Sequence, residues 1–368
     1  MVAIGRLCRL VLGGSGGSQG SAPEPRPHPP MANPVLIEVT RGKLVESSHR
    51  GALVVADAGG RKVLALGDVT VPVFPRSAVK LIQALPLVES GAADRFGYGN
   101  AEIALACGSH VGSERHVAIA RSMVERLGLT ETCLACGAAM PMGEKAAQAL
   151  AAGGGVPTAF HHQCSGKHAG MLAAAKAMGA SVDPRAYAEE DHPVQRDVKR
   201  ALETLSGGKI GEEMSGLDGC SVPTWAIPLE RLARLFAVVA TGHGASGTRN
   251  EALSRILAAC WAEPELVAGP GRAETVVMAA LPGQIYMKSG AEGVYCGALP
   301  GLGLGFALKI DDGAQRACAA TVMPLIEQLL PAAQGLVQRS VLRATTGAVA
   351  GTIRAAAGFQ NALDTLKG

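Results

Sequence analysis

A serine and a lysine three residues apart open the first helical stretch of the chain. Ser77 and Lys80 bound the tetrapeptide SAVK, and residues i and i+3 of a helix lie on one face. A serine hydroxyl is a weak nucleophile until a base removes its proton, and a lysine becomes that base when burial or a second cation lowers its pKa. The pair therefore indicates hydrolysis through a serine ester. On its own, the tetrapeptide is more often an N-cap serine followed by a solvated lysine.

A second lysine and a second serine extend this prediction. Lys288 precedes Ser289 and Gly290 at the end of a predicted strand, and KSG resembles the KTG that accompanies S-x-x-K in penicillin-recognising enzymes. Ser109, which follows an apolar helical stretch, would relay a proton with Lys288 as its partner. Taken singly, Lys288 also fits a surface lysine before a turn, and Ser109 fits the end of a helix.

A third cluster combines soft and basic groups within five residues. The segment CSGKH at 164–168 holds a thiol, a hydroxyl, an amine and an imidazole, which are costly to bury without purpose. Cys164 and Cys220 could supply two soft ligands to a zinc ion. Two buried free cysteines are the commoner case. The pair Cys133 and Cys136 has no matching second pair, so we expect it to be structural.

The elements that must position these residues run in the order strands, helices, strands, helix. Short β-rich runs lie between residues 34 and 66 and return between 284 and 310. Helical patterns cover 77–90, 100–107, 113–127, 166–178, 193–205, 229–240, 247–259 and 314–330. Strands near both ends with helices between them predict an α+β fold, with an antiparallel sheet and a helical subdomain.

Composition narrows the class of protein. The 368 residues carry 34 basic and 31 acidic side chains, a formal net charge of +3, without a basic run interleaved with aromatics. This argues against a nucleic-acid partner. No apolar stretch is long enough to predict a membrane span. Nine cysteines, an odd number, together with no convincing secretion signal, predict a reducing, cytoplasmic location.

Three segments are expected along the chain. Residues 1–33 are rich in Gly, Ser and Pro and are predicted to be a disordered extension, with either Met1 or Met31 as the true start. Residues 34–332 are expected to form the catalytic domain. Residues 333–368 are expected to form a tail with a last strand and a helix.

Five blocks together carry a family resemblance. In order they are PRSAVKLIQALPLVESG, ACGSHVGSERH, HHQCSGKHAGMLA, GLDGCSVPTWAIPL and MKSGAEGVY. They resemble the type-II asparaginases of the rhizobial kind (class 3) over roughly residues 34–330. The resemblance implies a fold similar to serine β-lactamases and penicillin-binding proteins, a homodimer, and hydrolysis of the side-chain amide of L-asparagine.

The resemblance also implies roles for individual residues. Two serine–lysine tandems fall on Ser77 with Lys80 and on Ser109 with Lys288, and Ser77 would be the nucleophile. A zinc site made of two cysteines and a lysine falls on Cys164, Lys167 and Cys220. Asp218 would support that lysine, while Arg76 and His168 would line the substrate pocket.

Two other functions stay open from the residues alone. A penicillin-recognising hydrolase would share the two lysine motifs, although the chain has no recognisable S-D-N element and no clear export signal. A non-catalytic zinc-binding protein would keep Cys164 and Cys220 for the metal while the serines are incidental.

Overall fold

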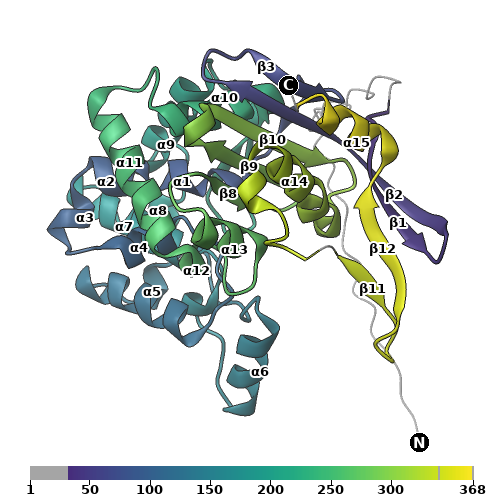
Figure 1. The fold of residues 1–368 in the computed structure, drawn as a ribbon. Helices are drawn as coiled ribbons and strands as arrows, with labels where there is room; N and C mark the ends of the chain where they lie inside the picture. The colour runs from purple at the N-terminus through teal and green to yellow at the C-terminus, as the bar shows by residue number, and fades with distance from the viewer. Residues whose placement is uncertain (1–31, 339, 367–368) are drawn as a thin grey trace, which may run out of the picture. The chain divides into compact units, whose positions relative to one another are not determined.

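An antiparallel sheet built from both ends of the chain organises the fold (Figure 1). The computed structural model describes residues 32–338 and 340–366, so nearly all of the expected extension at 1–33 lies outside the described residues. The strands run across the sheet in the order β11 (Val341–Arg343), β12 (Val349–Ala355), β1 (Val35–Arg41), β2 (Leu44–Asp57), β10 (Leu304–Ile310), β9 (Val294–Leu299) and β8 (Tyr286–Ser289). The predicted α+β class with an antiparallel sheet is confirmed.

The long strand β2 joins two parts of this sheet. Its first half pairs with β1, where Glu38 lies opposite Ser48. Its second half is apolar and buried, and it pairs with β10 on one edge and with β3 (Lys62–Leu66) on the other. A strand that is buried on both faces reads as a continuous hydrophobic stretch, which is the pattern of GALVVA. Strand β2 therefore forms the centre of the core.

The C-terminal tail contributes to the sheet. Strand β12 pairs with β1, with Ile37 opposite Ala355, and helix α15 (Ala357–Asp364) contacts β1. The segment after residue 333 thus contains two strands, β11 and β12, where one strand was expected, and one helix.

The helices lie mainly between β3 and β8 in the sequence and gather beside the sheet in Figure 1. Their bounds are α1 (Lys80–Gln83), α2 (Leu85–Glu89), α3 (Ala92–Arg95), α4 (Asn100–Ala106), α5 (Glu114–Arg126), α6 (Glu144–Ala152), α7 (Ser165–Ala177), α8 (Pro184–Tyr187), α9 (Pro193–Ser206), α10 (Leu229–Thr241), α11 (Gly247–Ala262), α12 (Pro264–Val267), α13 (Ala273–Ala280) and α14 (Gln315–Leu329). The long predicted helices are confirmed to within a few residues. The single helix expected at 77–90 is instead three short pieces.

The broken helix begins with a 3-10 turn, and a proline accounts for its last break. The turn is η1 (Arg76–Val79), followed by α1 and then α2, which has Pro86 in its first turn. Proline lacks the N–H that an uninterrupted helix would use at that position, so the chain restarts a helix there. The break leaves Ser77 in a tight turn at the edge of the helical part.

Two smaller sheets connect the helices. Strand β4 (Pro72–Val73) pairs with β7 (Ile227–Pro228), and β5 (Ser215–Leu217) pairs with β6 (Pro223–Trp225). The tight turn between β5 and β6 carries Asp218 and Cys220, with Ser221 at a φ of 69°. Strand β7 closely follows β6 and pairs with β4, which directly precedes η1. The turn between β5 and β6 therefore lies next to the start of η1.

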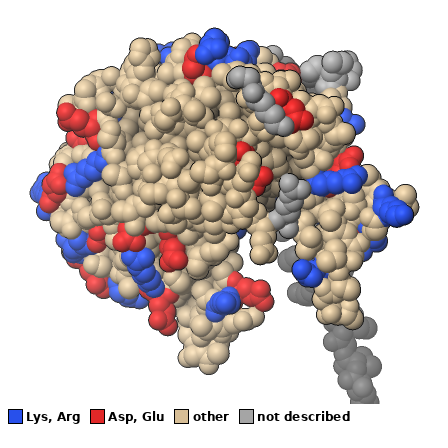
Figure 2. All heavy atoms as spheres, viewed as in Figure 1, with Lys and Arg blue, Asp and Glu red and all other residues tan. Residues whose placement is uncertain are grey.

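Charges on the visible face are mixed rather than grouped by sign. Figure 2 shows acidic and basic side chains interspersed, in keeping with the small net charge of +3. In the described part of the chain, no helix combines the length and the apolar character that crossing a membrane would need.

Candidate active site

A cavity of about 580 Å³ opens where η1, α13, α14 and the end of β8 meet. Three of the four predicted catalytic residues line it, namely Ser77, Ser109 and Lys288. The fourth, Lys80, is buried with 1% of its surface exposed, and it contacts Ser109. The fold therefore brings together four residues that are spread over more than two hundred positions of sequence.

The approach of β8 to η1 depends on a glycine. A side-chain carbon placed on Gly290 would lie 2.5 Å from the carbonyl oxygen of Pro75 and 3.3 Å from the backbone nitrogen of Ala78. Only a residue without Cβ permits this contact. Gly290 thus sets the position of Ser77 relative to Lys288.

The amine of Lys80 lies at the meeting point of several groups. Its Nζ lies 3.1 Å from Ser109 Oγ and 3.2 Å from Cys164 Sγ, and it also donates to the carbonyl oxygen of Gly108. No described hydrogen bond joins Lys80 to Ser77, although the two residues are three apart across η1 and α1. In this structure Lys80 thus pairs with the second serine, a contact that the sequence did not indicate.

The second lysine, Lys288, is equally buried, with 1% of its surface exposed. Its Nζ donates to the carbonyl oxygen of Ser289 at 2.8 Å, and no described hydrogen bond joins it to Ser109. Burial lowers the pKa of Lys288 to about 7, with Glu274 acting in the opposite direction and Lys80 adding to the decrease. A lysine with a pKa near neutrality can both accept and donate a proton at physiological pH.

Cys164, Lys167 and Cys220, the metal ligands that the family resemblance implies, lie close together in the structure. Lys167 Nζ donates to Cys220 Sγ at 2.8 Å, and all three side chains are buried. Hydrogen bonding from Cys164 and the charge of Lys167 lower the pKa of Cys220 to about 5 against the effect of burial. The pKa of Lys167 is raised, because the neighbouring thiols outweigh the effect of burial. The cluster thus contains a thiolate beside a cationic amine.

The three predicted substrate-binding residues surround this cluster. Arg76 donates to Asp218 at 3.0 Å, and Arg76 has a positive φ of 51°, which few non-glycine residues adopt. His168 is fully buried, with Nδ1 bonded to the Tyr187 hydroxyl at 2.7 Å. Its Nε2 has no hydrogen-bond partner among the described residues. None of the three residues is among those lining the 580 Å³ cavity.

The sequence reasoning missed Glu274, which lines the cavity from the first turn of α13. Its carboxylate is 2% exposed and accepts hydrogen bonds from the backbone N–H and the hydroxyl of Ser289. Although burial raises it, the charges of Lys288 and Arg272 bring the pKa of Glu274 below its usual value. The only sequence signal was an acid in the first turn of a helix, which is common.

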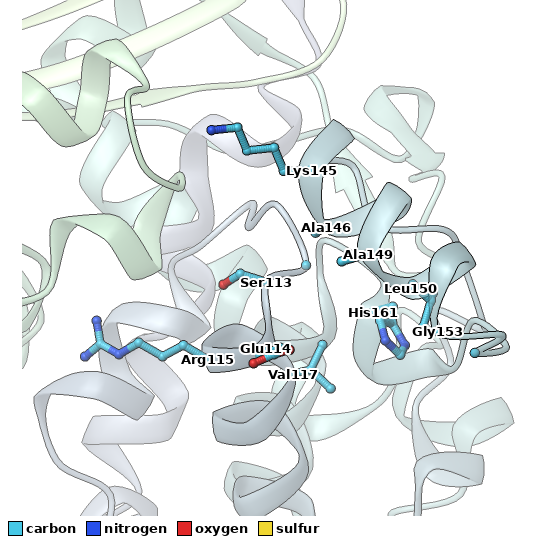
Figure 3. Close-up of a pocket in the computed structure, with 12 residues that line it drawn as sticks. Ser113, Glu114, Arg115, Val117, Lys145, Ala146, Ala149, Leu150, Gly153 and His161 are labelled. Carbon is cyan, nitrogen blue, oxygen red and sulfur yellow. The ribbon is translucent and has the colours of Figure 1, made fainter.

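A second cavity, of about 650 Å³, lies between α5 and α6. Ser113, Arg115, Lys145 and His161 lie around it together with Ala146 and Ala149 of α6, as Figure 3 shows. It holds none of the predicted catalytic, substrate-binding or metal-binding residues, and no buried lysine lines it. The predicted catalytic residues are therefore found at the smaller cavity beside Lys288.

Comparison with known families identifies the chain. The sequence profile described as L-asparaginase II matches residues 37–355, which is most of the 368 residues. The chain belongs to the L-asparaginase II family. Membership of this family implies L-asparaginase activity, in agreement with the prediction made from the five sequence blocks. No curated protein matches the chain in sequence.

Solved structures similar to this asparaginase-family chain share little sequence with it. A structure titled as Mglu in its native form in the presence of 4.3 M NaCl has 16% identity and a TM-score of 0.41, and the match covers 81% of this chain and 65% of that one. Another Mglu structure has 17% identity and a TM-score of 0.42, covering 82% and 72%. A β-lactamase from Mycobacterium bovis has 12% identity and a TM-score of 0.34, covering 72% and 88%.

Proposed function

We propose that the protein hydrolyses the side-chain amide of L-asparagine to L-aspartate and ammonia through a serine nucleophile and two buried lysines. The observation that carries the proposal is the cavity in which Ser77, Ser109 and Lys288 meet, with Lys80 beneath it. Family membership supports asparagine as the substrate. The serine–lysine chemistry is our proposal for how this chain performs the reaction.

Ser77 is the nucleophile in this proposal. It lines the cavity and is partly exposed, so a substrate amide carbon can reach its hydroxyl. Lys80 takes the Ser77 proton, backbone N–H groups stabilise the oxyanion, and the amide nitrogen leaves as ammonia. The position of Lys80 in the turn after Ser77 supports this step, because residues i and i+3 of a 3-10 turn lie above one another.

Ser109 and Lys288 pass a proton to the departing ammonia. Lys80 contacts Ser109 at 3.1 Å, which supports the first part of a proton path from Lys80 through this hydroxyl to Lys288, which lines the same cavity. Water then hydrolyses the aspartyl ester and regenerates Ser77. Each buried lysine moves one proton, and neither has to leave its pocket.

The residues Cys164, Lys167 and Cys220 would hold a zinc ion. Two soft sulfur atoms and one amine meet at this point, and they fit zinc, which prefers sulfur and nitrogen ligands, once Lys167 releases its proton as the metal binds. Among the residues that the structure describes, no group of three or more His, Cys, Asp and Glu could hold a metal, and the proposed site differs from such groups because Lys167 is one of its ligands. When bound, zinc would orient the α-amino or α-carboxylate end of the substrate.

Arg76, Asp218 and His168 would complete substrate binding around the cysteines. The ion pair between Arg76 and Asp218 at 3.0 Å keeps both side chains at the turn beside Cys220. The unpartnered Nε2 of His168 is a buried polar atom next to the same cluster in sequence. A buried atom of this kind is costly unless a ligand satisfies it, which supports a role in binding. We further propose a homodimer, which the mass in solution would test.

Ammonia release from asparagine and from glutamine tests the proposal. One methylene in a fitted pocket is worth about 1–3 kcal/mol, so asparagine should be preferred about 10- to 200-fold. Ser77→Ala should abolish ammonia release while leaving the melting temperature unchanged. Full activity of Ser77→Ala would refute the nucleophile. Hydrolysis of a chromogenic β-lactam without ammonia release would favour a penicillin-recognising enzyme, and bound zinc without either activity would favour a non-catalytic zinc protein.

A further inference from the structure

We propose that Glu274 is a positioning residue that holds the Lys288 amine in place through Ser289, and this rests on the function proposed above. The bonds form a chain. Glu274 Oε1 accepts from Ser289 Oγ at 2.5 Å and from the backbone N–H of Ser289 at 3.3 Å, and Lys288 Nζ donates to the carbonyl oxygen of Ser289 at 2.8 Å. Glu274 therefore fixes Ser289, and the carbonyl oxygen of Ser289 in turn fixes the amine of Lys288.

Geometry explains why one carboxylate reaches this segment. Glu274 lies in the first turn of α13, and α13 packs on β8, which ends at Ser289. Strand β8 pairs with β9, with Ser289 opposite Tyr295, so the last residue of β8 is held on both sides. The Lys288 side chain extends from a segment that Glu274 and β9 together make rigid.

Charge gives Glu274 a second effect on Lys288. The groups that act on Lys288 are Glu274 from α13, Arg272 just before it, Lys80 from α1 and Cys164 just before α7. Arg272 is a cation that disfavours the protonated amine, and Lys80 acts in the same direction whenever it carries a proton. Glu274 is the carboxylate in this set, and it opposes both the cations and the burial that lowers the pKa of Lys288. Its charge therefore keeps part of the Lys288 population protonated near neutral pH.

A merely structural role would need only the hydrogen bonds. Glutamine in place of Glu274 has nearly the same shape and still offers an oxygen to Ser289, but it carries no charge. Either residue can accept the bonds from Ser289, so the hydrogen bonds alone give no reason for an acid here. Glu274→Gln therefore separates the charge from the packing.

The expected effect has a definite sign. Removing the negative charge favours the neutral amine, so Lys288 loses its proton at lower pH than in the parent protein. An opposite charge nearby changes a pKa by about one pH unit or more. The proton that Lys288 passes to ammonia is then scarcer above neutrality. At pH 8 the kcat of Glu274→Gln should be about 10-fold lower than that of the parent, and the difference should shrink toward pH 6.

The test measures the titration of Lys288 directly and then the activity. Lysine labelled at Cε with ¹³C is followed by NMR from pH 5 to pH 10 in the full chain, and Lys288→Met assigns the signal. In Glu274→Gln the midpoint should move to lower pH. In Glu274→Asp, which keeps the charge but shortens the reach to Ser289, the midpoint should stay and kcat should fall. The matched control is Glu265→Gln, an exposed carboxylate of α12, which should change neither.

Each outcome decides the inference. An unchanged Lys288 midpoint in Glu274→Gln, or parent kcat in Glu274→Asp, overturns it. A loss of kcat that is equal at every pH shows a structural role and also overturns it. The titration does not depend on activity. If the parent releases no ammonia while the midpoint still moves, the proposed function fails and the effect of Glu274 on Lys288 stands.

Discussion

Gly290→Ala tests whether the contact between β8 and η1 sets the catalytic geometry. The added Cβ would lie 2.5 Å from the Pro75 carbonyl oxygen, and ordinary Cβ contacts begin at 3.4 Å, so the two segments must separate by about 0.9 Å. The two atoms that the Cβ would approach, the Pro75 oxygen and the Ala78 nitrogen, belong to the backbone and cannot rotate away. Overpacking of this kind costs about 1–3 kcal/mol of stability.

The catalytic effect should exceed the effect on stability. Ser77 follows Pro75 by two residues, and Lys288 precedes Gly290 by two, so a shift of this size changes the distance between nucleophile and lysine. A misplacement of about 1 Å can lower the rate about 100-fold. We therefore expect kcat/KM for asparagine to fall about 100-fold in a protein that remains folded at the assay temperature.

Gly301→Ala is the matched control for this substitution. Gly301 lies in the short 3-10 turn η5 (Pro300–Leu302), and nothing lies within 4 Å of a Cβ added there. Its activity and melting temperature should match those of the parent. The reasoning is refuted if Gly290→Ala keeps the parent kcat/KM, because the contact would then have no influence on the site.

Two other perturbations give distinct results. Cys220→Ser should lower bound zinc, measured by metal analysis of the purified protein, whereas Cys296→Ser, a buried cysteine of β9, should keep the parent metal content. Undiminished zinc in Cys220→Ser would contradict the ligand set. Glu274 has a folded-state pKa below its usual value, so it stabilises the fold above the unfolded pKa, and this contribution is lost as pH falls through the folded one. Melting temperatures between pH 6 and pH 3 should therefore fall more steeply in the parent than in Glu274→Gln, and parallel curves would rule this out.

Most of the regular structure could be predicted because local patterns decide it. The apolar run of β2 and the helical periodicity of α7, α9, α10 and α11 identify these elements from neighbouring residues alone. The division of residues 77–90 into short pieces could not be predicted in the same way. Pro86 marks the restart of the chain at α2, but the 3-10 turn at Ser77 depends on contacts with β8.

The candidate site shows the same limit. Motifs identified the serines, lysines and cysteines, and the fold brings them together as a group. The partners within the group depend on three-dimensional packing. The contact between Lys80 and Ser109 joins residues 29 apart, and Glu274 reaches Ser289 from a helix without any motif. Neither contact corresponds to a periodic pattern of residues in the sequence.

The pairing of β1 with β12 has a consequence for synthesis of the chain. Thr40 and Thr352 share a hydrogen bond across this pair at 3.0 Å, although 312 positions separate them. At a translation rate of about 5–20 residues per second, β1 waits about 15–60 s for its partner. During that interval one edge of β1 has unpaired N–H and C=O groups, and such edges bind other strands. The nascent protein is therefore exposed to aggregation from the time that β1 emerges, and it should depend on chaperones until β12 leaves the ribosome.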